Sequence, residues 1–297
     1  MAITAQDVKA LRDKTGAGMM DCKKALIECD GDINKASDWL REKGIAKAAK
    51  KADRIAAEGA TRVVVDGNAA IIFEVNAETD FVAKNDSFIA LMDEIQAILV
   101  AGKPATLEAA LEVETNGKTL ATLITEATAT IGEKISLRRV DLVEKTSADV
   151  FGAYIHMGGK ISAVTVLENS DNAQVAKDIA MQVASMSPQF VSRNDMSQDF
   201  IENERHMQME ILKNDESLSG KPEKVLLGIV EGRLTKSLQE MCLVDQIFFK
   251  NPDLKVGQYV KEANTSVKSF VRYAVGEGIE KRSENFADEV MNQVNNK

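Results

Sequence analysis

The order strand, tight turn, strand, loop and helix occurs twice in the chain, and this repetition constrains the fold more than any other feature of the sequence. In the first copy, Thr61–Val65 and Ala69–Val75 flank Asp-Gly-Asn, and a helix is predicted from about Val82 to Val100. In the second copy, Gly152–Met157 and Ile161–Leu167 flank Gly-Gly-Lys, and a helix follows. A Val-Ala-Lys triplet lies near the start of each predicted helix. The repeat predicts two related α+β subdomains, and therefore an α+β fold.

Helical segments surround this pair of subdomains. Apolar residues spaced along one face predict three short helices within residues 4–44, with Thr4 and Asp7 as a capping box. A highly charged helix, Phe200–Leu212, and a second helix with an apolar stripe, Pro222–Glu240, predict an antiparallel hairpin inserted into the second subdomain. The single apolar stripe buries little within the hairpin, so its exposed part could pair with a second copy of the chain or with another protein.

Beyond the hairpin, the chain is predicted to return to the second subdomain. Met241–Phe249 and Thr265–Val275 have the composition of strands, a short helix lies between them near Val256–Ala263, and the tail Glu284–Val294 is predicted to be helical. The expected domain limits are a three-helix N-terminal domain at 1–44, a linker at 45–59, core subdomain N at 60–145, the first part of core subdomain C at 146–194, the helical hairpin at 195–240, the return to subdomain C with a C-terminal module at 241–282, and the helical tail at 283–297.

A scarcity of reactive side chains excludes most enzyme classes. The 297 residues include two His and three Cys, too few for a three-His metal site or a disulfide framework. The sequence has no P-loop, H-E-x-x-H, C-x-x-C or G-x-S-x-G motif. The 37 Lys and Arg against 46 Asp and Glu give a net charge of −9, which disfavours a nucleic-acid binder. We therefore expect a binding protein that has no cofactor, no metal and no enzymatic activity.

Two alternatives stay open at this point. Lys47, Lys50, Lys51 and Arg54 lie in an Ala- and Lys-rich connector and could bind RNA or a ribosome, although a solvated helical linker explains them as well. His156, before a Met-Gly-Gly turn, could serve as the acid or base of an enzyme, but the sequence offers no nucleophile to pair with it. The apolar runs are too short to span a bilayer and the start lacks a signal-peptide pattern, so a cytoplasmic location is expected.

The loop Glu78–Phe81 is the most informative segment. When the two repeats are aligned on Val-Ala-Lys, the second copy has Ala173 and Gln174 where the first has its Asp and Phe. The junction of loop and helix can therefore be made without an acid or an aromatic residue. Two interpretations remain. Thr or Asp could cap the helix while Phe81 turns inward, or an exposed, rigidly held Phe81 could enter a pocket of a partner, as aromatic anchors do.

The chain resembles the elongation factor Ts family from residue 2 to about residue 290. T-D-F-V alone is a weak motif, but here it occurs together with T-G-A-G-M-M-D-C-K-K and G-E-G-I-E-K, in the family's order. The segments that carry the resemblance are Leu11–Leu26, Asn76–Asp86, Thr130–Val140, Ala153–Lys160, Glu231–Arg233 and Phe270–Lys281.

The resemblance implies a guanine-nucleotide exchange factor. In this family a three-helix domain of the ubiquitin-associated type docks on a GTPase, a loop enters beside its Mg²⁺ and phosphate site, and a helical hairpin forms a coiled-coil module. The matching Mg²⁺-dislocation loop is Thr79, Asp80, Phe81 and Val82. The residues that match other partner contacts are Arg12, Met19, Met20, His156, Val275, Gly276, Gly278 and Ile279.

The resemblance also implies the partner. It is elongation factor Tu, bound both with GDP and without nucleotide, and neither a membrane nor direct contact with nucleic acid is expected. Whether the helical hairpin makes a homodimer or a second contact with the partner stays open.

Overall fold

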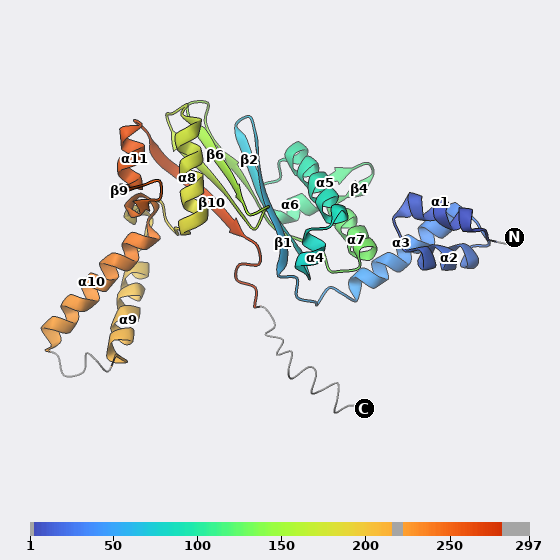
Figure 1. The fold of residues 1–297 in the computed structure, drawn as a ribbon, viewed down its shortest axis with the longest axis horizontal. Helices are drawn as coiled ribbons and strands as arrows, with labels where there is room; N and C mark the ends of the chain where they lie inside the picture. Colours follow the sequence, from blue (N-terminus) through green and yellow to red (C-terminus); the bar gives the residue numbers. More distant parts are fainter. Residues whose placement is uncertain (1–2, 216–221, 281–297) are drawn as a thin grey trace.

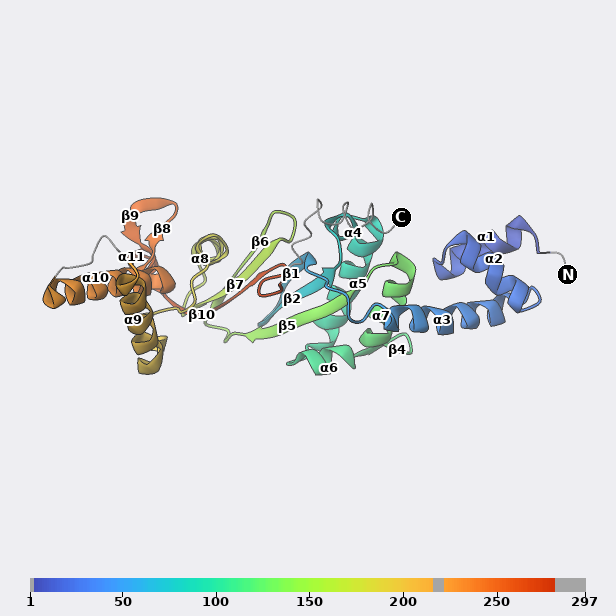
Figure 2. The same ribbon diagram turned by 90° about the horizontal axis from the view of Figure 1, so that it is seen from below.

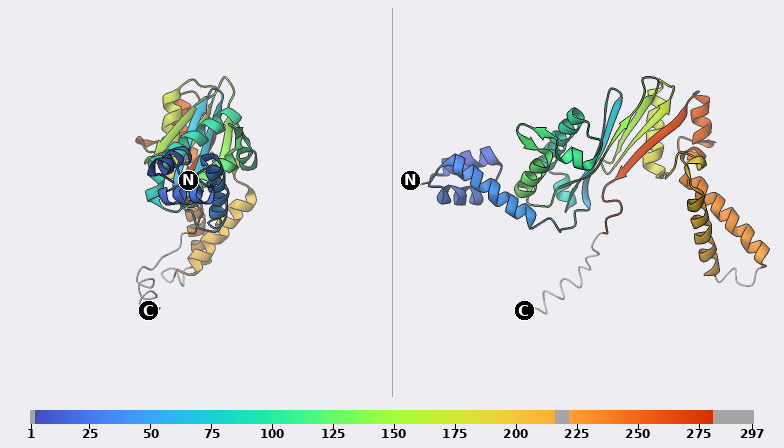
Figure 3. Two further views of the ribbon diagram at one scale, coloured as in Figure 1. Left: turned by 90° about the vertical axis from the view of Figure 1, so that its right-hand side faces the viewer. Right: turned by 180° about the vertical axis from the view of Figure 1, so that it is seen from behind.

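The computed structural model describes residues 3–215 and 222–280, and it has three parts in a row (Figure 1). An N-terminal helical domain and a helical hairpin extend from opposite ends of a central core of sheets and helices (Figure 3). The mixture of helices and antiparallel sheets confirms the predicted α+β class. The predicted tail helix Glu284–Val294 lies outside the described residues.

The N-terminal domain consists of α1 (Ala5–Thr15), α2 (Met19–Glu28) and the first part of α3 (Ile33–Ala49). The predicted capping box between Thr4 and Asp7 is present. A small cluster that includes Leu11, Cys22 and Leu26 holds the three helices together. The third helix is longer than predicted, because it continues through the first five residues of the expected linker and packs against α7 (Leu120–Ile131).

Each half of the core is a three-stranded antiparallel sheet with the same strand order. The first sheet has the order β1-β2-β5 and the second the order β10-β7-β6. Their bounds are β1 Glu58–Asp66, β2 Ala69–Ala77 and β5 Ser136–Glu144 in the first sheet, and β6 Val150–His156, β7 Ile161–Glu168 and β10 Ser266–Ala274 in the second. Since β5 and β10 occupy the same place in their sheets, the predicted repeat extends to a third strand.

The two sheets pack back to back between layers of helices (Figures 1 and 2). Helix α5 (Asp86–Gly102) and α7 cover the outer face of the first sheet, and α8 (Ala173–Met186) covers that of the second. Residues from both sheets, among them Ile72 and Val164, form a separate apolar cluster between them. At one corner, the Thr61 N–H donates to the Gly159 carbonyl oxygen at 2.7 Å.

The single helix predicted from Val82 to Val100 is wrong, because the structure divides it into α4 (Asp80–Ala83) and α5. The break has a local cause. The Asn85 side chain accepts the backbone N–H of Ser87 at 2.9 Å, which starts a new helix at that point. Between α5 and α7 lie α6 (Leu107–Leu111) and the two-residue strands β3 (Glu114–Thr115) and β4 (Lys118–Thr119).

The predicted hairpin is present as α9 (Gln198–Lys213) and α10 (Glu223–Met241), preceded by a 3-10 turn, Arg193–Asp195. Val230, Leu234 and Leu238 of α10 are buried. Other apolar side chains of the hairpin are exposed, namely Met207, Ile211, Val225 and Leu227. Pairing of this surface with another copy or another protein therefore stays a prediction.

The strand predicted at Met241–Phe249 is wrong. Helix α10 runs through Met241, a 3-10 turn follows at Leu243–Asp245, and β8 (Ile247–Phe248) has only two residues. This stretch forms a compact turn, in which the Gln246 side chain donates to the Glu240 carbonyl oxygen at 2.7 Å and the side chains of Ile247 and Phe249 are exposed. The chain then forms β9 (Asn251–Lys255) and α11 (Val256–Glu262) before β10, as the predicted return to the second sheet requires. Within residues 3–215 and 222–280, no helix is both long and apolar enough to cross a membrane.

Candidate partner-binding site

Helix α4 is held by side chains from distant parts of the first half. Thr79 is its N-cap, and the Thr79 hydroxyl accepts the Val82 N–H at 3.3 Å. The carboxylate of Glu133, just after α7, accepts the Thr79 N–H at 3.0 Å and the Thr79 hydroxyl at 2.7 Å. The N-cap is therefore fixed by a residue 54 positions further along the chain.

Glu78 fixes the chain on the other side of this cap. Its carboxylate accepts the Lys134 N–H at 2.6 Å and the Arg54 guanidinium at 3.3 Å. The Lys134 ammonium in turn donates to the Arg54 carbonyl oxygen at 2.9 Å. These hydrogen bonds tie the connector, the loop and the residues before β5 to one another, so the loop is held rigidly.

The Phe81 side chain points away from this rigidly held base and is 83% exposed. The interpretation in which it turns inward is wrong, because Val82 and Ala83 pack against the core and occupy the inner side of the single helical turn. Asp80 lies beside Phe81 and forms an ion pair with Lys84 at 2.7 Å. The hydrogen bond from Lys84 lowers the pKa of Asp80, so a carboxylate stands next to the exposed ring.

The turn between β6 and β7 presents a second predicted contact. Gly158 and Gly159 have φ values of 65° and 99°, in the region that favours glycine. They turn the chain so that Met157 is 74% exposed. The preceding His156 has its Nδ1 atom 2.9 Å from the Tyr154 hydroxyl oxygen, which orients the imidazole.

The segment after β10 is a third predicted contact, and it is tied to that turn. The Val275 N–H donates to the Lys160 carbonyl oxygen at 2.9 Å. Gly276 has φ of 71°, and a Cβ atom there would lie 2.2 Å from the Ala57 carbonyl oxygen, so no other residue fits. The Ile279 N–H then closes a tight turn onto the Gly276 carbonyl oxygen at 3.0 Å.

These three segments meet around the start of β1. The Lys160 ammonium pairs with the Glu58 carboxylate at 2.8 Å. Helix α4 packs against β1, the strand that begins with Glu58. Gly278, with φ of 77°, lies near Arg138 in the same region. The structure therefore brings together the loop, the His156 turn and the segment Val275–Ile279, which are far apart in the sequence.

Comparison with known protein families decides what kind of protein carries this arrangement. Residues 78–277 match the family described as Elongation factor TS, and residues 1–49 match the family described as Elongation factor Ts, mitochondrial, N-terminal. The chain belongs to the elongation factor Ts family. It is therefore a translation elongation factor, and the first match spans the loop, the His156 turn and the segment after β10 as far as Glu277.

The remaining predicted contacts lie on the N-terminal domain. Arg12 is exposed on α1. Met19 and Met20 open α2 and are 43% and 76% exposed. A three-helix domain has too small a core to bury every apolar side chain. Two flexible, exposed Met side chains are well suited to a binding surface.

Two residues that hold the candidate site, Glu133 and Glu74, were not predicted. Glu133 lies within the matched segment Thr130–Val140, but no pattern in the sequence pairs it with Thr79. Glu74 lies within a strand and was expected to be an ordinary strand residue, yet it is fully buried and hydrogen-bonded to the segment after β10. A carboxylate inside an otherwise apolar strand is the only signal that could have indicated it. Within residues 3–215 and 222–280, no cluster of three or more His, Cys, Asp or Glu is placed to hold a metal ion.

Proposed function

We propose that this protein is the guanine-nucleotide exchange factor of elongation factor Tu, and that Phe81 acts as a wedge beside the Mg²⁺ and phosphate site of that GTPase. The observation that carries the proposal is an 83% exposed Phe81 on a helical turn that Glu78 and Thr79 fix at its base. An exposed aromatic ring on a rigid mount loses little conformational entropy when it enters a pocket. A ring on a mobile loop would lose more.

Displacement of the Mg²⁺ surroundings is sufficient to release nucleotide. Mg²⁺ requires nearly ideal octahedral ligation at about 2.0–2.1 Å, so a small shift of the elements around it weakens the site. In a GTPase the ion and the phosphates stabilise one another, and loss of the ion weakens the hold on GDP. The exchange factor itself therefore needs no catalytic residue, and all bond-breaking chemistry belongs to the partner.

Thermodynamic linkage then gives the cycle its direction. If the factor lowers the affinity of elongation factor Tu for nucleotide by some ratio, nucleotide lowers the affinity for the factor by the same ratio. The factor binds the GDP complex, forms a tight complex once GDP has left, and is expelled when GTP binds. Its partner states are therefore the GDP-bound and the nucleotide-free GTPase, in the cytoplasm where translation takes place.

The other contacts extend the surface around the wedge. Met157 and His156 would contact a second part of elongation factor Tu, and Val275–Ile279 would contact the GTPase together with Phe81. Met19, Met20 and Arg12 would dock the N-terminal domain on the GTPase. Several separated contacts orient the wedge, because only one position of the partner satisfies all of them.

The basic connector offers less support for RNA binding. Lys47 pairs with Asp21 at 3.0 Å, and the Arg54 guanidinium donates to Glu78 at 3.3 Å. The Lys51 ammonium donates to the Gly132 carbonyl oxygen. Side chains engaged in this way hold the connector against the protein, which favours the linker interpretation over a surface for phosphates.

Phe81→Ala tests the proposal. We expect GDP release from elongation factor Tu, measured by stopped flow with fluorescent GDP, to slow by about 30-fold, the equivalent of a hot spot of about 2 kcal/mol. The melting temperature should not change, because the side chain makes little contact with its own protein. The control is Val65→Ala, a 43% exposed apolar residue at the other end of β1. An unchanged rate for Phe81→Ala, or equal losses for the two variants, would reject the wedge.

A further inference from the structure

Glu74 is a fully buried carboxylate on β2, the strand that leads to the Phe81 loop. One carboxylate oxygen accepts the Gly276 N–H at 2.8 Å and the Asn76 side-chain amide at 3.0 Å. Arg138 donates to the same oxygen at 3.2 Å, and Arg139 donates to the other at 2.5 Å. A single side chain of β2 thus collects a backbone amide from the segment after β10 and two guanidinium groups from β5.

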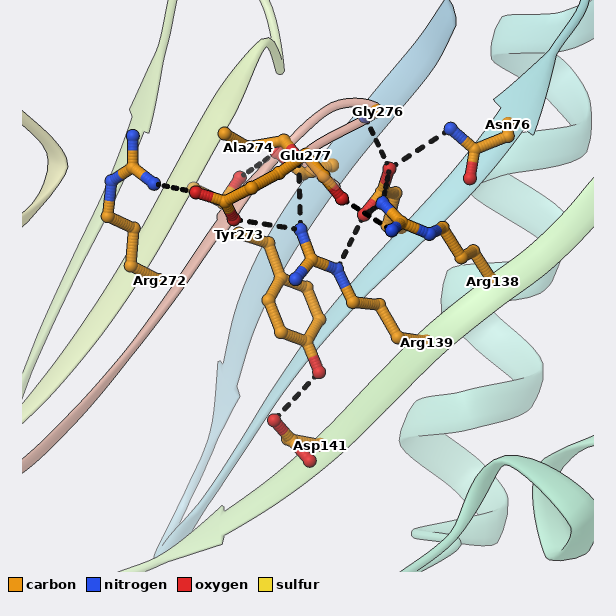
Figure 4. A network of polar contacts seen from close by, with 12 residues as sticks. Asn76, Arg138, Arg139, Asp141, Arg272, Tyr273, Ala274, Gly276 and Glu277 are labelled. Atoms are coloured by element: carbon orange, nitrogen blue, oxygen red, sulfur yellow. Dashed lines mark hydrogen bonds and ion pairs between the residues drawn. The ribbon is translucent and has the colours of Figure 1, made fainter. Parts of the chain in front are cut away.

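The two guanidinium groups also hold that segment. Arg139 donates to the Ala274 carbonyl oxygen at 2.9 Å and lies 3.9 Å above the centre of the Tyr273 ring. Arg138 donates to the Glu277 carbonyl oxygen. Figure 4 shows these contacts of Arg138 and Arg139 around Gly276 and Glu277, together with the hydrogen bond from the Tyr273 hydroxyl to Asp141, which joins β10 to β5.

The repeat provides an internal control for what this carboxylate does. Glu74 is the sixth residue of β2, and the sixth residue of β7 is Val166. Val166 is 1% exposed and belongs to the apolar cluster between the sheets. The same place in the second half is thus filled by an ordinary apolar side chain, so packing of two sheets does not require a charge there.

A buried ion network is poor evidence for stability. Removing charges from water costs several kcal/mol per ion, and apolar residues of similar volume are often as stabilising. The best-attested use of such a group is to select one arrangement of the chain over others. Burial alone would raise the pKa of Glu74, but the hydrogen bonds from Gly276, Asn76 and Arg139 outweigh it and the pKa is lowered, so the group is a carboxylate at neutral pH.

Glu74 sets the position of one predicted contact, the segment Val275–Ile279, relative to another, the Phe81 loop. Four residues separate Glu74 from Thr79, and β2 covers most of that distance as regular strand. On the other side, Gly276 lies between Val275 and Ile279. The Glu74 carboxylate therefore connects the strand that carries the Phe81 loop directly to the segment Val275–Ile279.

We propose that Glu74 is a positioning residue that fixes the segment Val275–Ile279 relative to the Phe81 loop, so that elongation factor Tu meets both contacts at once. The inference rests on the proposed function for its partner. It adds a residue that does not touch the partner and acts through the segment it holds.

The first test concerns the free protein. In Glu74→Gln, amide hydrogen exchange at Gly276 and Ile279 should become at least about 10-fold faster, because the acceptor of the Gly276 N–H loses its charge. The control is Val166→Ala, which weakens the corresponding place in the second half without touching this segment. Unchanged protection of Gly276 in Glu74→Gln, or equal loss in both variants, would overturn the proposal.

The second test is a double-mutant cycle on exchange activity. Glu74→Gln should raise the concentration of factor needed for half-maximal stimulation by about 10-fold, while GDP release at saturating factor stays close to wild type because Phe81 is intact. Ile279→Ala should lose most of its effect when added to Glu74→Gln, since both act on one segment, whereas Phe81→Ala should keep its full effect. Additive losses for Glu74→Gln and Ile279→Ala would show a merely structural role and overturn the proposal.

Arg138→Ala is the milder variant, should Glu74→Gln fail to fold. Arg138 is 27% exposed and contacts both Glu74 and Glu277, so its removal loosens the same segment without leaving a buried charge unpaired, since Arg139 remains. The same loss of Gly276 protection and the same coupling to Ile279→Ala are expected, and their absence would overturn the proposal. If wild-type protein does not stimulate GDP release, the proposed function fails, whereas the hydrogen-exchange result still decides whether Glu74 fixes the segment.

Discussion

The two halves of the core leave their second strand in the same way and then diverge. Thr79 and Asn172 stand at corresponding places, and each side chain accepts the N–H three residues ahead, from Val82 at 3.3 Å and from Val175 at 3.1 Å. In the second half, α8 then runs for 14 residues. In the first half, α4 stops after four residues and α5 begins anew beyond Asn85.

This difference shows what the first half gains by breaking its helix. In the second half, the residues after the cap lie on a continuous helix whose inner face is buried, beginning with Val175 and Ala176. In the first half, Val82 and Ala83 are only partly buried, and the short turn lifts Phe81 into solvent. The fold tolerates either solution, so the exposed ring is a property of the site and not of the architecture.

The largest effect is expected from large-to-small changes in the two outer layers. Phe88→Ala in α5 and Ile179→Ala in α8 each remove a side chain that is 0% exposed. We expect losses of about 3–5 and about 2–5 kcal/mol in the free energy of unfolding. Because the sheets share an apolar cluster, both variants should shift one common urea transition seen by circular dichroism. Two separate transitions, each moved by only one variant, would show that the halves are independent units.

A smaller effect is expected at the two helix N-caps. It distinguishes a role in holding the Phe81 loop from a role in stability alone. Asn172→Ala removes a cap worth about 1 kcal/mol. Thr79→Ala removes a cap and also the hydrogen bond from the Thr79 hydroxyl to Glu133. The free energy of unfolding, measured by thermal unfolding, should therefore fall by about 2 kcal/mol. Only Thr79→Ala should slow GDP release from elongation factor Tu, because only α4 carries the wedge. Thr79→Ser keeps the hydroxyl and should restore both values, and equal behaviour of the two Ala variants would contradict a special role for the first junction.

Much of this comparison could be predicted from sequence, because it depends on local periodicity. The hairpin strands, the short helix near Val256–Ala263 and the strand near Thr265–Val275 follow from alternation, turn residues and helical spacing. The break at Asn85 could not be predicted. No Gly or Pro marks it, and only a capping side chain competes with helix continuation there.

The residues that hold the site were beyond prediction for a different reason. Thr79 and Glu133 are 54 positions apart, and Glu74 and Gly276 are 202 apart. Contacts of this kind are set by how the sheets pack, and local patterns carry no information on it. For Phe81 the sequence left two interpretations, and its exposure decided between them. Motifs thus indicated which residues are proposed to meet the partner, whereas the residues that position them required the tertiary structure.

The smallest expected effect is on the free energy of unfolding at acidic pH, where one carboxylate from each half can be compared. Glu74 is the buried carboxylate of the first half. In the second, Asp149 accepts the backbone N–H groups of Thr146 and Asn169 and pairs with Lys268, each at 3.2 Å. Burial would raise the pKa of Glu74, but its hydrogen bonds outweigh burial and hold the pKa below the ordinary 4.5. At Asp149, the hydrogen bonds from Thr146 and Asn169 are the main cause of a pKa below the ordinary 3.8.

A carboxylate whose pKa is lower in the folded than in the unfolded protein stabilises the fold above its unfolded pKa, and this contribution is lost as pH falls through the folded pKa. The free energy of unfolding from urea titrations should therefore be insensitive to these groups from pH 7 to about pH 5, and should fall below about pH 4.5 for Glu74 and below about pH 3.8 for Asp149. In Asp149→Asn, the dependence of the free energy of unfolding on pH should weaken only below about pH 3.8. In Glu74→Gln, this dependence should weaken from about pH 4.5 downwards. A wild-type slope retained in Asp149→Asn would mean that the second half does not depend on this carboxylate, and that the two halves differ in their charged anchors as well as in their junctions.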